Sequence, residues 1–219
     1  MLDQRTGRAI AAGFHVIGDG RTLLGTLVAD RARGGAMRAA ATLLMVVLTA
    51  VAAQVSIQLP FTPVPFTLQP MLVLLGGAAL GSRLGMASQI LYLFAGLAGL
   101  PVFAASSVLP QGPLRLLGPT GGYLMAYPFA AFVTGWLAER GFDRRYVTSV
   151  AAMAAGLLLI FAGGITWLAL FAQPSPVGFS QAVNVGLLPF FPADIVKLFI
   201  AAAILPSVWK VTGRIERRG

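Results

Sequence analysis

The stretch YVTSVAAMAAGLLLIFAGGITWLAL, residues 146–170, decides the fold class of this chain. It contains no charged residue, and it is long enough to cross the hydrocarbon core of a bilayer, which takes about 20 residues of helix. The low charge continues beyond it, because Asp194 and Lys197 are the only charged residues between Arg145 and Lys210. Such a run predicts membrane-spanning helices and argues against a soluble domain.

The composition of the whole chain agrees with this prediction. Of its 219 residues, 57% are hydrophobic and 11% are charged, whereas about 25% of the residues in a soluble domain are charged. The mean hydropathy is +0.82. There is no cysteine, which excludes disulfides and thiolate metal sites, and the single histidine, His15, lies in a polar N-terminal segment.

Apolar runs that end at proline, glycine or charged residues mark the remaining spans. We predict an all-α integral membrane protein with six transmembrane helices, at about 37–57, 66–82, 84–100, 120–137, 146–170 and 185–209. Residues 37–209 then form one membrane domain and 210–219 a basic tail. Residues 1–36 are a polar extension that is either disordered or amphipathic, and Met37 is an alternative start of translation.

The basic residues fall on one side of this arrangement. All sixteen Lys and Arg residues except Arg115 and Lys197 lie in the N-terminal segment, the second and fourth connections and the C-terminal tail. The positive-inside rule therefore places both termini in the cytoplasm, with the chain crossing the membrane several times. The net charge of +9 does not indicate nucleic acid, because no basic stripe with interleaved aromatic residues is present.

Asp194 and Lys197 are the first candidates for a functional site. A charge in mid-membrane costs about 2.5–3.5 kcal/mol on insertion scales, so such residues are usually kept for a function. Their spacing of three places both side chains on one helical face. A purely structural explanation is also available, because Asp194 follows Pro192 at a helix start, where a carboxylate is favourable. Lys197 would then extend toward the membrane surface or neutralise Asp194.

Segments rich in proline and glycine gather on the opposite, sparsely charged side of the membrane. They are residues 58–69, 99–103, 115–123 and 189–197, and we expect them to surround one outward-facing pocket. The candidate pocket residues beside the charged pair are Arg115, Gly121, Tyr123 and Phe103. Gln58 and Gln69 either form hydrogen bonds in the pocket or satisfy the proline-interrupted backbone.

Enzyme chemistry finds little support in the sequence. The membrane region has no histidine for a Ser–His arrangement and only one carboxylate, which excludes an aspartic dyad. We expect no catalytic residue, no bound metal and no cofactor. Small residues on the first helix, among them Thr49 and Ala53, predict a close contact with another membrane protein.

Four motifs, taken in order, resemble the biotin transporter BioY family: PVPFTLQ at 63–69, GLPVF at 99–103, GPTGGY at 118–123, and PFFPAD at 189–194 followed by Lys197. The resemblance implies a substrate-binding S component of an energy-coupling factor transporter, with residues 37–209 as the substrate-binding domain. Such a component binds its vitamin on the outer side. It works with a transmembrane coupling protein and cytoplasmic ATP-binding-cassette ATPases, surrounded by membrane lipid.

The resemblance also implies the roles of individual residues. Asp194 would accept the ureido N–H groups of biotin, while Lys197 and Arg115 would hold its carboxylate. Phe103 and Tyr123 would pack against the apolar ring, and Ser106 is a further contact. Two alternatives stay open, which are an S component for another carboxylated vitamin and a non-transporting subunit of a membrane assembly. Self-association, and dedicated or shared ATPase partners, are also left open.

Overall fold

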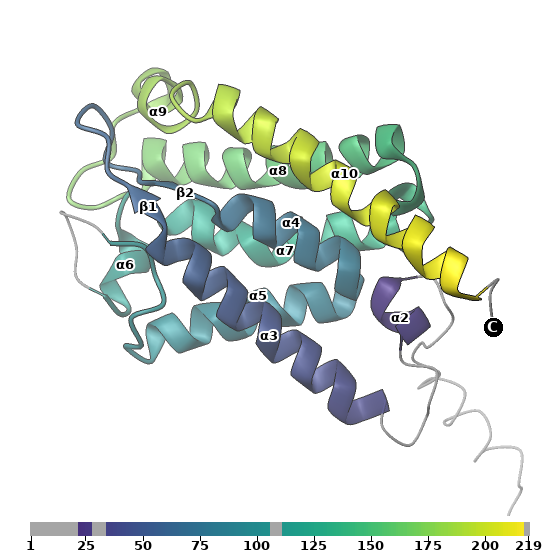
Figure 1. The fold of residues 1–219 in the computed structure, drawn as a ribbon. Coiled ribbons are helices and arrows are strands. Elements are labelled where there is room, and N and C mark those ends of the chain that lie inside the picture. Colours follow the sequence, from purple (N-terminus) through teal and green to yellow (C-terminus); the bar gives the residue numbers. More distant parts are fainter. Residues whose placement is uncertain (1–21, 28–33, 106–110, 217–219) are drawn as a thin grey trace, which may run out of the picture.

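The computed structural model describes residues 22–27, 34–105 and 111–216 (Figure 1). Its elements are α2 (Leu23–Leu27), α3 (Gly34–Gln54), β1 (Ser56–Ile57), β2 (Phe66–Thr67), α4 (Gln69–Leu80), α5 (Ser82–Leu97), α6 (Leu114–Leu117), α7 (Gly121–Ala138), the 3-10 turn η1 (Phe142–Arg144), α8 (Tyr146–Leu170), α9 (Phe179–Gly186) and α10 (Phe191–Glu216). The helical fold class is confirmed. The two strands pair antiparallel as a minimal hairpin, with Ser56 opposite Thr67.

Three of the described helices are long and apolar enough to cross a membrane. They are α3, α8 and the Phe191–Val211 part of α10. The spans predicted at 66–82 and 84–100 correspond to α4 and α5, which have only 12 and 16 residues. The span predicted at 120–137 corresponds to α7. Each predicted span therefore has a helix, while the crossing of the bilayer by all six stays a prediction.

Two predicted boundaries were wrong. The span expected to begin at residue 66 starts later, because Phe66 and Thr67 pair with β1 and Pro70 occupies the first turn of α4. The span expected at 185–209 is divided in two, since α9 ends at Gly186 and α10 begins at Phe191. Proline favours the first turn of a helix and glycine its end, so Pro192 and Gly186 account for this break.

Helix α7 packs against α4, α5 and α8 at the centre of the bundle. Glycines make the close approaches possible: a Cβ on Gly77 of α4 would meet the backbone of Ala131 on α7, and one on Gly135 of α7 would meet that of Ser82. In a membrane, where apolar side chains gain little by leaving lipid, such backbone proximity is a main source of helix association.

The two ends of the bundle differ in character (Figure 1). The hairpin β1–β2, α6, α9 and the start of α10 gather at one end, and α2, the turn between α4 and α5 and the C-terminal part of α10 lie at the other. The first end carries the proline- and glycine-rich segments identified in the sequence. These segments therefore converge at one end of the bundle, as the sequence led us to expect.

Two carboxylates connect elements at the second end. Glu139, just after α7, accepts hydrogen bonds from the Ser82 backbone N–H at 2.7 Å and the Ser82 hydroxyl at 2.8 Å, at the start of α5. The indole of Trp209 on α10 donates to Asp143 of η1 at 2.6 Å. Burial raises the pKa of the Asp143 carboxyl, although this hydrogen bond opposes the shift.

The N-terminal segment contributes to the same end. Leu23 of α2 is buried and belongs to the hydrophobic core, and Thr22 beside it is buried as well. Helix α2 contacts α4. This short part of the predicted extension is therefore packed helix, and most of residues 1–36 lie outside the described residues.

Thr49 and Ala53, the predicted partner contacts on α3, are both fully buried within this chain. The Thr49 hydroxyl donates to the Met45 carbonyl and accepts from the side chain of Gln89 on α5. The face of α3 that is open to other molecules carries large apolar residues instead: Leu43, Leu44, Val47 and Val51. A partner meeting α3 would therefore contact these side chains first.

Candidate functional site

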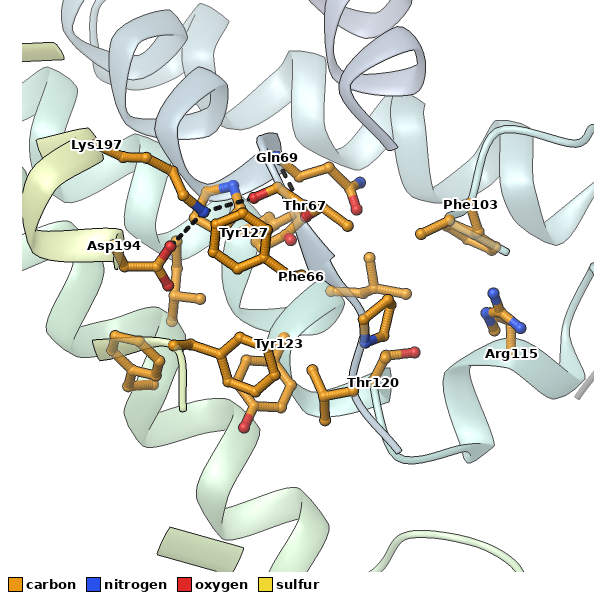
Figure 2. Close-up of a pocket in the computed structure, with 18 residues that line it drawn as sticks. Phe66, Thr67, Gln69, Phe103, Arg115, Thr120, Tyr123, Tyr127, Asp194 and Lys197 are labelled. Carbon is orange, nitrogen blue, oxygen red and sulfur yellow. Dashed lines mark hydrogen bonds and ion pairs between the residues drawn. The ribbon is translucent and has the colours of Figure 1, made fainter. Parts of the chain in front are cut away.

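A cavity lies at the end of the bundle where β2, α6 and the start of α10 meet (Figure 2). Aromatic and aliphatic side chains make up most of its wall, and the polar groups are few: Thr67, Gln69, Arg115, Thr120, Asp194 and Lys197. A mostly apolar pocket with a few placed polar groups is the usual form of a small-molecule site.

The charged pair predicted from the sequence forms at one side of this cavity. Helix α10 has Pro192 in its first turn, and the Asp194 backbone N–H donates to the Phe190 carbonyl at 2.8 Å. The Lys197 ammonium donates to Asp194 Oδ1 at 2.5 Å, so the spacing of three does bring both heads together. Asp194 is 7% exposed and Lys197 is 8% exposed.

Lys197 is held by the hairpin as well as by Asp194. Its Nζ donates to the Thr67 carbonyl at 2.7 Å and lies 3.8 Å from the centroid of the Phe66 ring. The ammonium therefore points inward and does not extend to the membrane surface. Because the hairpin and α10 are far apart in sequence, this lysine also connects the two segments that form this wall.

Arg115 occupies the opposite side of the cavity. It lies on α6 and is only 2% exposed, and burial lowers the pKa of its guanidinium below the usual value. The segment that carries it is fixed to the end of α8, because the Trp167 indole donates to the Gly118 carbonyl at 2.9 Å and the Gln173 N–H donates to the Leu117 carbonyl at 2.8 Å.

Figure 2 shows Arg115 and Lys197 on opposite sides of the cavity. We had expected both cations to hold one carboxylate, and the structure does not bring them together for that task. The sequence could not reveal this separation, because it depends on how α6 and α10 approach the cavity from different directions. The cavity instead has two polar ends with aromatic side chains between them.

Both predicted aromatic residues lie where they were expected. The ring of Tyr123 lines the cavity, and its hydroxyl donates to the Gly186 carbonyl at 2.8 Å, which connects α7 to the end of α9. Phe103 lines the cavity from the opposite side and is fully buried. Tyr127 was not selected from the sequence, although its place one helical turn after Tyr123 on α7 puts it on the same face.

Two other candidates are not cavity residues, and one cannot be placed. Gly121 starts α7, and a Cβ there would collide with the Leu116 carbonyl, so its role is close packing. Gln58 is exposed and donates to the Ala105 carbonyl at 2.6 Å. Ser106 lies outside the described residues. Within the described residues, no cluster of His, Cys, Asp or Glu could hold a metal ion.

Comparison with known proteins agrees with this geometry. The model of the BioY family matches residues 26–214. The chain belongs to the BioY family. This confirms the resemblance seen in the sequence motifs, and it places the chain among membrane transport proteins and not among enzymes.

Two relatives are similar over most of their length. A probable biotin transporter BioY of Pyrococcus horikoshii is 45% identical over 161 residues, which are 74% of this chain and 89% of the relative. The biotin transporter BioY of Thermotoga maritima is 38% identical over 161 residues, again 74% of this chain and 89% of the relative.

A solved structure shares the fold. It is the crystal structure of the S-component for biotin from an ECF-type ABC transporter, and it superposes with a TM-score of 0.72 at 24% sequence identity. The match covers 83% of this chain and 95% of the other. The arrangement of helices in this BioY family member is therefore that of an S-component.

Proposed function

We propose that this chain binds biotin and serves its uptake across the bacterial cytoplasmic membrane, as the S component of an energy-coupling factor transporter. One observation carries the proposal. The cavity has a buried Asp194–Lys197 pair on one side, a buried Arg115 on the other, and aromatic rings between them. Biotin has the same order of groups, with a polar ureido ring, an apolar middle and a carboxylate.

The geometry supports one orientation of the ligand. The ureido group presents N–H donors beside a carbonyl acceptor, and the adjacent carboxylate of Asp194 and ammonium of Lys197 offer the matching acceptor and donor. The valerate carboxylate then reaches Arg115, whose planar guanidinium can form two parallel hydrogen bonds with it. Tyr123, Tyr127 and Phe103 would contact the apolar middle.

Burial explains why an anion is the expected ligand at Arg115. A guanidinium at 2% exposure lies in a region of low dielectric constant, where its charge-assisted hydrogen bonds with a carboxylate are stronger than in water. The same reasoning favours a ligand that carries its single charge at one end, because Lys197 already neutralises Asp194.

The membrane arrangement that goes with this function has six spans with both termini in the cytoplasm. The positive-inside distribution supports it, and the cavity then opens on the outer side, where the vitamin is captured. A transmembrane coupling protein and ATP-binding-cassette ATPases would supply the energy. The exposed apolar face of α3, from Leu43 to Val51, is available to lipid or to the coupling protein.

Ligand binding by the detergent-purified protein tests the function. We expect biotin to raise the midpoint of thermal unfolding, followed by tryptophan fluorescence, and biotin methyl ester to raise it much less. Stabilisation by another carboxylated vitamin, with none by biotin, would favour an S component of different specificity. A folded protein that responds to no such vitamin would overturn the proposal in favour of a non-transporting subunit.

A further inference from the structure

Gln69 is a polar cavity residue to which the proposed orientation of biotin gives no role. It is the first residue of α4 and only 3% exposed. Its backbone N–H donates to the Thr67 hydroxyl at 3.3 Å, and the Thr67 carbonyl in turn accepts from Lys197. The backbone of Gln69 therefore lies beside Thr67, and its side chain extends from there toward the Phe103 side of the cavity (Figure 2).

Tyr92 of α5 contacts the side chain of Gln69 and is fully buried. Its hydroxyl lies 2.6 Å from Gln69 Nε2 and 3.0 Å from the Val102 carbonyl oxygen. A phenol has one hydrogen to donate, and a carbonyl can only accept. The hydrogen must therefore go to Val102, and the Tyr92 oxygen must accept a hydrogen bond from Gln69.

This assignment fixes the direction of the Gln69 amide. At ordinary resolution the two ends of an amide are told apart only by their hydrogen-bond partners, and here the partner requires the nitrogen to face Tyr92. The oxygen then faces the other way, on the side of the cavity. A ligand N–H placed beside this oxygen would form a hydrogen bond, which contributes about 0.5–1.5 kcal/mol net.

We propose that Gln69 accepts a hydrogen bond from a ligand N–H group, and that Tyr92 is the positioning residue that orients it. The proposal rests on the proposed function, because the N–H in question belongs to the ureido ring of biotin. Gln69 thereby adds an uncharged acceptor to the Asp194 carboxylate, so that each ureido N–H has a partner of its own.

Tyr92 also positions the far wall of the cavity. Its ring meets that of Phe103 edge to face, with centroids 5.5 Å apart, and Phe103 packs against Gly96 one turn further along α5. By accepting from Gln69 and donating to Val102, this tyrosine holds the start of α4 and the 101–103 segment at a fixed spacing.

A double-mutant cycle tests the link between the two residues. Biotin affinity is measured by calorimetry for the wild type, Gln69→Leu, Tyr92→Phe and the double variant. We expect each single change to weaken binding about tenfold, as the loss of one buried hydrogen bond does. The double variant should bind about as well as Gln69→Leu alone, since Tyr92 then has no amide left to orient. Tyr146→Phe, an exposed tyrosine at the start of α8, is the matched control and should bind normally.

The outcomes separate this proposal from the proposed function. If the wild type binds no biotin, the function itself fails. If the wild type binds and the two losses multiply in the double variant, Tyr92 acts only on general stability, and the positioning role is wrong. If Gln69→Leu binds as tightly as the wild type, Gln69 makes no ligand contact. The unfolding midpoint without ligand, measured for all variants, shows whether a lost affinity accompanies lost stability.

Discussion

Asp194 and Lys197 depend on each other more than on any other group in the cavity. Each is less than a tenth exposed, and they share a 2.5 Å hydrogen bond inside the bundle. A buried pair of this kind adds little net stability, because both charges lose their hydration. Its presence in the wall of a cavity is therefore better explained by a ligand that takes part in the same hydrogen bonds.

Removing either partner should abolish tight binding. Asp194→Ala or Lys197→Ala leaves one charge buried and uncompensated, a change that costs about 3–5 kcal/mol. We expect biotin affinity, measured by calorimetry, to fall at least a hundredfold in both variants. Arg144→Ala serves as the control, because Arg144 stacks on Trp209 at the other end of the bundle. Equal affinities in all three variants would contradict the assigned site.

Arg115 should govern recognition of the carboxylate alone. In Arg115→Ala we expect biotin to lose about 1.5–3 kcal/mol of binding free energy, the range for hydrogen bonds to charged groups. Biotin methyl ester should bind the variant and the wild type alike. Arg115→Lys should recover only part of the loss, because an ammonium lacks the fork geometry. If the ester lost as much affinity as biotin, the orientation of the ligand would have to be reversed.

At the scale of elements, structure formed within one segment was predictable from the sequence, whereas contacts between distant segments were not. The pairing of Asp194 with Lys197 follows from helix geometry, and the 146–170 helix follows from its uncharged length. The hairpin that replaces the start of the second span was missed, because its partner strand lies within the segment assigned to the first. The Gln69–Tyr92 contact joins α4 to α5 across 23 residues, and no periodicity predicts such a pair.

The start of α5, at the turn that follows α4, is stabilised by a residue from another part of the chain. Glu139 follows α7, yet it accepts from the N–H and hydroxyl of Ser82 and so caps the start of α5. A carboxylate at a helix N-terminus is favourable, and loss of a cap costs typically about 1 kcal/mol. Glu139→Ala should therefore lower the unfolding midpoint and leave the biotin affinity unchanged.

Glu139→Gln provides the matched variant for this cap. Its amide oxygen can still accept both hydrogen bonds but lacks the charge, so its midpoint should fall between those of the wild type and Glu139→Ala. If Glu139→Ala lost as much biotin affinity as a variant of a cavity residue, the structure of this turn would be coupled to ligand binding.

For the molecule as a whole, the two ends of the bundle have separate tasks. Ligand-contacting groups are gathered at the end formed by the hairpin, α6 and the start of α10. The contacts of Glu139, Asp143 and α2 hold the opposite end together. Changes at one end are therefore expected to alter affinity, and changes at the other to alter stability.

The N-terminal segment allows this division to be tested on the intact molecule. The alternative start at Met37 would produce a chain without α2, and Leu23, which now belongs to the hydrophobic core, would be missing. Loss of a buried leucine side chain costs roughly 2 kcal/mol or more. A form beginning at Met37 should unfold at a lower temperature than the full chain and bind biotin with the same affinity.

Leu23→Ala in the full chain separates the packing of α2 from every other effect of the truncation. We expect it to reproduce most of the loss in unfolding midpoint, because the leucine supplies the buried contact, whereas Leu24→Ala, at a partly exposed position next to it, should lose less. If the truncated form were as stable as the full chain, α2 would contribute nothing to the fold, and a start at Met37 would be structurally sufficient. If it lost biotin affinity instead, the two ends of the bundle would be coupled through α4, the helix that α2 contacts and that carries Gln69 at its other end.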